Sequence, residues 1–166
     1  MSASSITHDE TSRPPAPQAY WLLGSLAIVH LRGEDTEGRF SLVEWLTPPG
    51  GMTPLHIHRE DSQTVYVLEG EVTFHLPGLT RVCGPGEVVH QPAGVPQTER
   101  VSSATPARML DVNAPAGFDA FVAAAGEPAE SPVLPSASGE DIDLEDLVAL
   151  ADAHGIVVLG PPGALP

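Results

Sequence analysis

A succession of short apolar segments between residues 20 and 112 constrains the fold more than any other feature of the sequence. Segments such as RFSLVEWL, TVYVL, EVTFHL and ARMLDV are apolar or alternate between apolar and polar residues, and turn sequences such as TPPGG, EG, PG and GPG separate them. Short strands that recur about every ten residues, with no helical segment between them, are typical of antiparallel sandwiches and barrels. The sequence therefore predicts an all-β fold.

The two ends of this β region differ from it in composition. Residues 1–19 are rich in serine, threonine and proline, and they lack the apolar side chains whose burial would offset the entropy of ordering. We expect a disordered N-terminal tail there, followed by a β-barrel over residues 20–125. A Pro- and Ser-rich linker is predicted at 126–141, and a C-terminal helix with a packing segment at 142–166.

Only one segment has a clear helical repeat. Apolar residues recur at helical spacing in Leu144, Leu147, Val148 and Ala151. Asp143 is a suitable N-cap, and Gly155 can adopt the left-handed conformation that ends a helix. A helix is therefore expected at about 144–154, with a short strand or packing segment at 156–159. We expect this region to cover one open end of the barrel.

Charge excludes two classes of partner. The chain carries 22 acidic and 7 basic residues, none of which is lysine, and its formal net charge is -15. Such a surface repels nucleic acid and anionic membranes, so neither is expected to bind. A single cysteine, Cys83, excludes a disulfide framework and is expected to be a buried small residue. Because no signal peptide is recognisable, we expect a cytoplasmic protein.

Two histidines carry the strongest chemical signal. His56 and His58 lie two residues apart in a predicted strand, so both side chains face the same side of the sheet. Two imidazoles in this arrangement can converge on one metal ion. The alternative is that they are polar residues lining a wet cavity. The acidic pair that follows them, Glu60 and Asp61, is interpreted as a solvated turn.

The histidines belong to two longer motifs. The first is Gly51-x4-His56-x-His58-x4-Gln63-x6-Gly70, and the second is Gly86-x5-Pro92-x-Gly94-x2-Gln97. These motifs resemble those of the cupin superfamily, and over about residues 20–166 the chain is similar to small, single-domain, quercetin-dioxygenase-like cupins. The resemblance implies a single jelly-roll β-barrel of six to eight strands, to which the short C-terminal helix is added.

The resemblance also implies a metal site of two histidines, a glutamate and a third histidine. Here only His56 and His58 match, because Gln63 stands at the glutamate position and Gln97 at the third histidine position. Two neutral imidazoles and two amides leave the charge of a divalent ion uncompensated. We therefore expect no metal, or a weakly bound divalent ion such as Fe, Ni, Mn or Zn. Glu99 is the candidate for a replacement carboxylate.

The candidate catalytic residues are therefore His56, His58, Gln63 and Gln97. Imidazole transfers protons near neutral pH, and amide NH2 groups can stabilise an enolate or phenolate oxygen. Other side chains are expected to line a pocket for a flat, hydrophobic ligand. These are Val65, Val67, Phe74, His75, Val88, His90, Glu99, Met109 and Leu110.

Three functional hypotheses follow from this site. The first is an enzyme of secondary metabolism that acts on a hydrophobic aromatic or polyketide-like substrate by metal-independent acid/base chemistry, in a cyclisation, isomerisation or dehydration. The second is a metal-dependent, quercetinase-like dioxygenase with an altered ligand set. The third is a ligand-binding cupin without catalytic activity. The resemblance also implies a homodimer.

Overall fold

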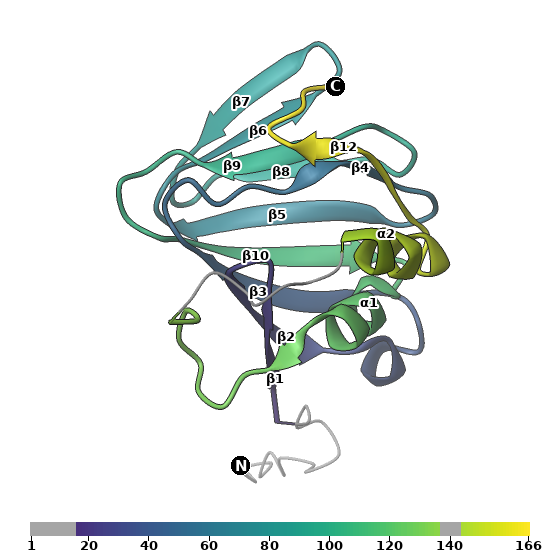
Figure 1. The fold of residues 1–166 in the computed structure, drawn as a ribbon. Coiled ribbons are helices and arrows are strands. Elements are labelled where there is room, and N and C mark those ends of the chain that lie inside the picture. The colour runs from purple at the N-terminus through teal and green to yellow at the C-terminus, as the bar shows by residue number, and fades with distance from the viewer. Residues whose placement is uncertain (1–15, 137–143) are drawn as a thin grey trace, which may run out of the picture.

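The protein folds into a barrel of antiparallel strands, in a computed structural model that describes residues 16–136 and 144–166. These residues contain twelve strands, two α-helices and one 3-10 helix, η2 (Gly33–Thr36) (Figure 1). The strands form sheets of seven, three and two strands. This architecture confirms the predicted all-β jelly roll, although the strands outnumber the six to eight expected.

The largest sheet provides one side of the barrel, in the order β11-β1-β2-β3-β10-β5-β8. Its strands are β1 (Gln18–Leu22), β2 (Ser25–Leu31), β3 (Ser41–Thr47), β5 (Ser62–Glu69), β8 (Val88–Gln91), β10 (Ala107–Ala114) and β11 (Glu127–Pro128). β10 is an interior strand of this sheet, between β3 and β5. Alternate residues of β10 are buried, as expected of a strand with one face toward the core.

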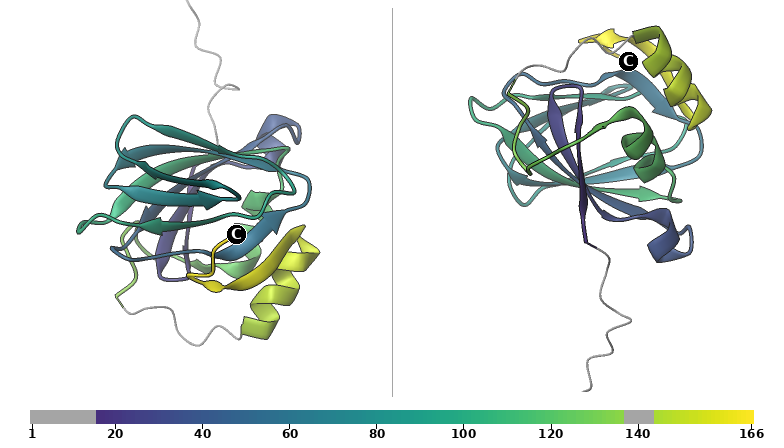
Figure 2. Two further views of the ribbon diagram at one scale, coloured as in Figure 1. Left: turned by 90° about the horizontal axis from the view of Figure 1, so that it is seen from above. Right: turned by 60° about the horizontal axis from the view of Figure 1, so that its bottom comes forward.

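The other side of the barrel consists of two smaller sheets. One has the order β7-β6-β9 and comprises β6 (Val72–Leu76), β7 (Leu79–Cys83) and β9 (Thr98–Val101). The other pairs β4 (Pro54–His58) with β12 (Ile156–Pro162). Single bridges join His56 to Gln97 and Met52 to Arg100, so β4 continues the barrel beside β9. Figure 2 shows the sheets curling around a common interior.

Two short helices flank one end of the barrel (Figure 1). α2 (Leu144–Ala153) confirms the predicted helix, and Gly155 follows it with a φ of 79°. The predicted N-cap, Asp143, lies outside the described residues. Sequence reasoning missed α1 (Phe118–Ala125), because its eight residues span only about two turns, too few for a clear helical period. Neither helix is long and apolar enough to cross a membrane.

The predicted boundaries of the barrel are too narrow at both ends. Gln18 and Ala19, assigned to the tail, belong to β1, and Glu127 and Pro128, assigned to the linker, pair with β1 as β11. The remaining tail residues 1–15 and linker residues 137–141 lie outside the described residues. β12 extends three residues beyond the predicted segment 156–159 and pairs with β4. The C-terminal segment is therefore part of the barrel wall.

Candidate functional site

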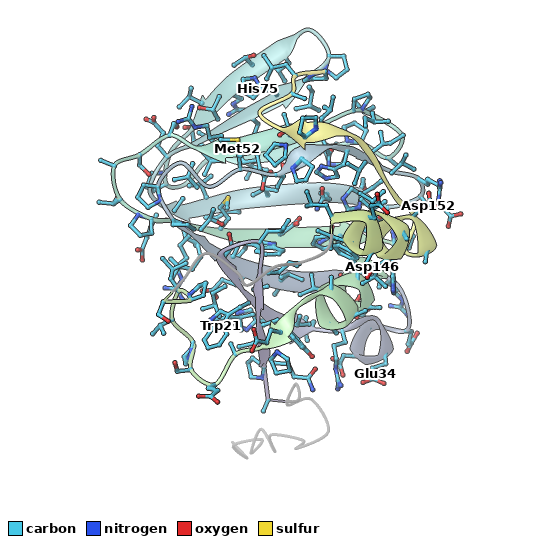
Figure 3. The ribbon with its side chains drawn as sticks, viewed as in Figure 1. Trp21, Glu34, Met52, His75, Asp146 and Asp152 are labelled. Carbon is cyan, nitrogen blue, oxygen red and sulfur yellow. The ribbon has the colours of Figure 1, made fainter. Side chains whose placement is uncertain are left out.

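A cavity of about 130 Å³ lies inside the barrel, at the end flanked by the helices. Its lining has two chemically different sides. We call the polar floor the set His56, His58, Gln63, Glu99 and Asp111. We call the apolar wall the set Leu22, Trp45, Phe118, Phe121, Leu147 and Ile156. Met52, which also lines the cavity, lies beside β9 (Figure 3).

His56 lies on β4, and a backbone hydrogen bond fixes its ring. Its Nδ1–H donates to the carbonyl oxygen of Pro54 at 2.8 Å, which leaves Nε2 with a lone pair. Burial, and then the nearby His58, lower the pKa of His56 from 6.5 to about 4. The imidazole is therefore uncharged at neutral pH and can accept a proton.

His58 is the more completely buried of the two histidines, with 2% of its side chain exposed. The two rings lie 5.2 Å apart, which confirms that they face the same way. His58 Nδ1 pairs with the Asp61 carboxylate at 2.9 Å, while the buried Nε2 has no hydrogen-bond partner. A carboxylate on one ring nitrogen fixes the tautomer and leaves the other nitrogen free to remove a proton.

Asp61 corrects an interpretation of the loop that follows β4. Only 14% of its side chain is exposed, because the carboxylate turns inward to His58. The solvated-turn interpretation is therefore wrong for Asp61, although Glu60 is exposed as expected. The sequence did contain a sign of this contact. Asp61 follows His58 by three residues, and a tight loop of that length can place the carboxylate beside the imidazole ring.

The two glutamines are tied into one chain of hydrogen bonds. Gln97 Nε2 donates to Gln63 Oε1, and Gln63 Nε2 donates to Asp111 Oδ2 at 2.9 Å. Both side chains are buried, and Gln97 Oε1 has no partner. One N–H of each amide is committed to this chain. The glutamines therefore orient the floor, and Gln63 connects it to Asp111.

Sequence reasoning missed Asp111, which lies on β10 with 4% of its surface exposed. Burial, reinforced by the nearby Glu99, raises the pKa of Asp111 well above its usual range. Burial also raises the pKa of Glu99 to about 7, against a side-chain hydrogen bond with Gln91 that lowers it. The available signal was the alternation of Met109, Asp111 and Asn113 on one face of the strand, which places a carboxyl group among inward-facing residues.

The donor set of the floor does not fit a tightly held divalent cation. Nε2 of His56 and of His58 could each bind a metal, but Gln63 Oε1 already accepts a hydrogen bond. The carboxyl groups of Glu99 and Asp111 have raised pKa values, which disfavours the anionic form that a metal requires. Among the described residues, no three His, Cys, Asp or Glu side chains come together in a metal-binding group.

The other residues predicted to line the pocket fall into three groups. Glu99 and Met109 do line the cavity. Val65, Val67 and Phe74 face the interior, but they are packed within a hydrophobic cluster and do not line the cavity. The prediction that these three residues line the pocket was wrong. The alternation of a strand predicts which side chains face the interior, but it does not predict which part of the interior is filled by side chains and which part is a cavity.

The remaining four predicted pocket residues lie elsewhere. Val88, His90 and Leu110 are on the outer face, because the inward positions of β8 are Val89 and Gln91 and those of β10 include Met109 and Asp111. His90 there pairs with Thr64 Oγ1 at 3.0 Å. His75 pairs with Thr80 at 3.0 Å, near the β6–β7 hairpin and far from α2 (Figure 3). Their assignment to the pocket is therefore wrong.

Comparison with known proteins agrees with this architecture. Residues 43–113 match the cupin domain family. The jelly-roll fold agrees with this match, so the barrel contains a cupin domain. It is 30% identical over 102 residues, 61% of its length, to quercetin 2,3-dioxygenase from Bacillus subtilis (strain 168). The matched region spans only 30% of that enzyme.

Solved structures of other cupins resemble the chain as well. The polyketide cyclase RemF from Streptomyces resistomycificus is 27% identical, with a TM-score of 0.50 over 66% of this chain and 79% of that one. An RmlC-like cupin from Shewanella frigidimarina NCIMB 400 is 19% identical, with a TM-score of 0.54 over 68% of this chain and 96% of that one. The relatives of this cupin thus include enzymes of more than one kind.

Proposed function

We propose that this cupin is an enzyme that acts on an uncharged aromatic or polyketide-like small molecule by acid/base chemistry that needs no metal. Cyclisation, isomerisation and dehydration all require a proton to leave carbon and another to reach oxygen. The observation that carries the proposal is His58, whose Nδ1 is paired with Asp61 while its buried Nε2 has no partner beside the cavity. The similarity to a polyketide cyclase supports it.

The lining of the cavity supports the substrate class. No described arginine lines it, and the chain has no lysine, so nothing in the cavity compensates the charge of an anionic substrate. Trp45, Phe118 and Phe121 add aromatic surface to the lining of the cavity. An apolar cavity of about 150 Å³ holds one benzene ring. The cavity of about 130 Å³ therefore suits a single ring, or the reacting ring of a larger substrate.

Proton exchange tests this proposal without knowledge of the natural substrate. Acetophenone is an uncharged single ring with an enolisable methyl group, and it is incubated with the protein in D2O without oxygen. We expect proton NMR to show deuterium entering the methyl group faster than in buffer. If acetophenone and ring-hydroxylated analogues bind but return without exchange, the site is a ligand-binding pocket without catalytic activity.

A second candidate function is a dioxygenase, favoured by the 30% identity to the Bacillus subtilis enzyme. This function would require metal ligands that the floor does not offer in its present hydrogen bonding. The test is oxygen uptake with quercetin after separate incubation of the protein with Fe, Ni, Mn and Zn. Uptake that depends on one of these metals would replace the acid/base proposal.

We also propose that the protein is a homodimer joined through the outer face of its largest sheet. Tyr66 is 41% exposed, and its neighbours in register are Val88, also exposed, and Leu110. Apolar residues on adjacent strands form a continuous patch that a second copy would cover. At moderate salt, sedimentation should give a dimer for the wild type and a monomer for Tyr66→Glu. Val82→Glu, on the exposed β7, should remain a dimer. A monomeric wild type would contradict the proposal.

A further inference from the structure

We propose that Asp111 is a catalytic acid, which delivers a proton to the oxygen of the substrate while His58 removes one from carbon, and that its burial beside Glu99 keeps it in the acid form. This inference rests on the proposed function, because it completes the proton balance of the same site. None of the motif positions that resemble the cupin family lies on β10, so the role would belong to a strand outside those motifs.

The placement of Asp111 is that of a fixed and accessible donor. β10 is hydrogen-bonded on both sides, and Asp111 lies opposite Val43 of β3 and Val65 of β5. Its Oδ2 accepts the N–H of Gln63, which fixes the carboxyl group. The buried Oδ1 has no hydrogen-bond partner, and the residue lines the cavity. A proton on Oδ1 would therefore be available to a bound ligand.

Burial and the nearby Glu99 together explain why Asp111 would keep its proton. Glu99 comes from β9 in the three-stranded sheet, and its side chain lines the same cavity. Burial is the main cause of the raised pKa of Asp111. Above about pH 7, where Glu99 ionises, the negative charge of Glu99 opposes ionisation of Asp111 further, with a smaller contribution from Asp61. The other titratable groups of the floor are His56 and His58, and no described arginine lines the cavity to favour the carboxylate. Two carboxyl groups in one dry site cannot both ionise readily.

The proton balance of the step is complete within the chain. His58 Nε2 takes a proton from the carbon next to a carbonyl group, and the electron pair of that C–H bond forms the enol double bond. Asp111 gives its proton to the carbonyl oxygen. The products are an enol, an imidazolium and a carboxylate, and no oxidant or metal is required. Return of the proton to a different carbon, or loss of water, completes an isomerisation or a dehydration.

Infrared spectroscopy tests the acid form independently of activity. We expect the full-length protein at neutral pH to show the carbonyl band of a buried carboxylic acid. Asp111→Asn should weaken this band, to which Glu99 also contributes because its pKa is about 7. The matched control Glu69→Gln, which changes an exposed carboxylate, should leave the band unchanged. A wild type without the band, or an Asp111→Asn variant with an unchanged band, would overturn the inference.

Exchange of acetophenone protons tests the role. Asp111→Asn should lower the exchange rate about 100-fold, the low end of the typical contribution of one acid or base group, while Glu69→Gln keeps the wild-type rate. In Glu99→Gln, which keeps both proton-transfer groups, the upper limit of the pH profile should move to lower pH because the charge opposing ionisation of Asp111 is gone.

The outcomes separate the two proposals. Exchange by the wild type that Asp111→Asn retains, or a pH profile that Glu99→Gln does not move, would overturn the role of Asp111 and leave the proposed function intact. No exchange by the wild type would remove the proposed function itself. Circular dichroism of each variant identifies any loss that is due to misfolding.

Discussion

The polar floor and the apolar wall of the cavity come from different parts of the chain. All five floor residues lie between residues 43 and 113, the region that matches the cupin domain. Five of the six wall residues lie outside it, in β1, the two helices and β12, and Trp45 is the exception. The region that matches the cupin domain therefore supplies the polar groups of the cavity, and the segments that precede and follow it supply most of the apolar surface.

The two sides are also held by different forces. The floor depends on directional hydrogen bonds between buried polar groups, such as those that join Gln97, Gln63 and Asp111. The wall depends on contact between apolar side chains, and the ring centroids of Phe118 and Phe121 lie 5.9 Å apart. Phe118 also joins the wall to the floor, since its ring centroid lies 5.3 Å from that of His58. Substitutions in the floor should change the chemistry most, whereas substitutions in the wall should change the stability most.

Removal of His58 should have the largest effect. His58→Ala deletes the proposed base, whose contribution to the rate is typically about 100-fold or more. We expect the rate of acetophenone exchange to fall at least about 100-fold, measured by proton NMR. His90→Ala, on the exposed outer face, is the matched control and should keep the wild-type rate. A His58→Ala variant that is as active as this control would locate the chemistry elsewhere.

Truncation of the wall should mainly destabilise the fold. Phe121 is buried against Phe118 and packs with Leu147 and Ile156, so Phe121→Ala leaves a hole between the barrel and α2. Large aromatic truncations in a core cost about 3–5 kcal/mol. We expect a loss near the lower end of this range in urea unfolding, because Phe121 already borders a cavity.

The control for the wall is Leu144→Ala at the exposed start of α2. It should change stability by no more than about 0.5 kcal/mol. If Phe121→Ala were as stable as Leu144→Ala, the helices would not be packed on the barrel as an integral layer, and the distinction between a structural wall and a chemical floor would fail.

The same division explains what the sequence could predict. The His56 and His58 pair and the turns that place Gln63 and Gln97 follow from local spacing, and the structure brings these residues together. The wall depends on α1, too short to show a period, and on β12, whose partner β4 is about 100 residues away. Asp111 was missed because its partners Gln63 and Glu99 lie on other strands, and local spacing does not predict such contacts.

The Glu99→Gln variant tests the polar floor through the pH dependence of its stability. Because burial raises the pKa of Glu99 to about 7, the folded protein binds this proton more tightly than the unfolded chain, in which the pKa is near 4.5. Stability from this group is present below about pH 4.5 and is lost as pH rises through about 7. Glutamine does not ionise, so Glu99→Gln does not lose this stability. As pH rises through this range, the free energy of unfolding of the variant should therefore increase relative to that of the wild type by roughly 1–3 kcal/mol.

Urea unfolding at about pH 5 and about pH 8 measures this difference. The low pKa of His56 acts in the opposite direction, since it destabilises the fold as pH falls from 6.5 toward about 4. That contribution is present in both proteins and cancels when they are compared. If the difference in stability between Glu99→Gln and the wild type does not change with pH, Glu99 is ionised in the folded protein throughout this range. The polar floor would then be more hydrated than its burial indicates.

Removal of metal should have the smallest effect of all. After dialysis against a chelator, we expect the rate of acetophenone exchange to change by less than about twofold and the metal content to stay well below one ion per chain. The reason is that Gln63 Oε1 is already engaged by Gln97, so within the polar floor only the two imidazoles remain as free neutral donors. Plasma mass spectrometry before and after dialysis measures the metal content.

The informative control restores the ligand set that the cupin resemblance implies. Gln63→Glu combined with Gln97→His gives the floor a carboxylate and a third imidazole beside His56 and His58, and this double variant should retain close to one divalent ion per chain. It would show that the barrel can hold a metal and that the two glutamines prevent it. If instead the wild type retains one ion, and chelation abolishes an activity that added metal restores, the floor is a metal site, and Glu99 is the carboxylate to examine as a ligand.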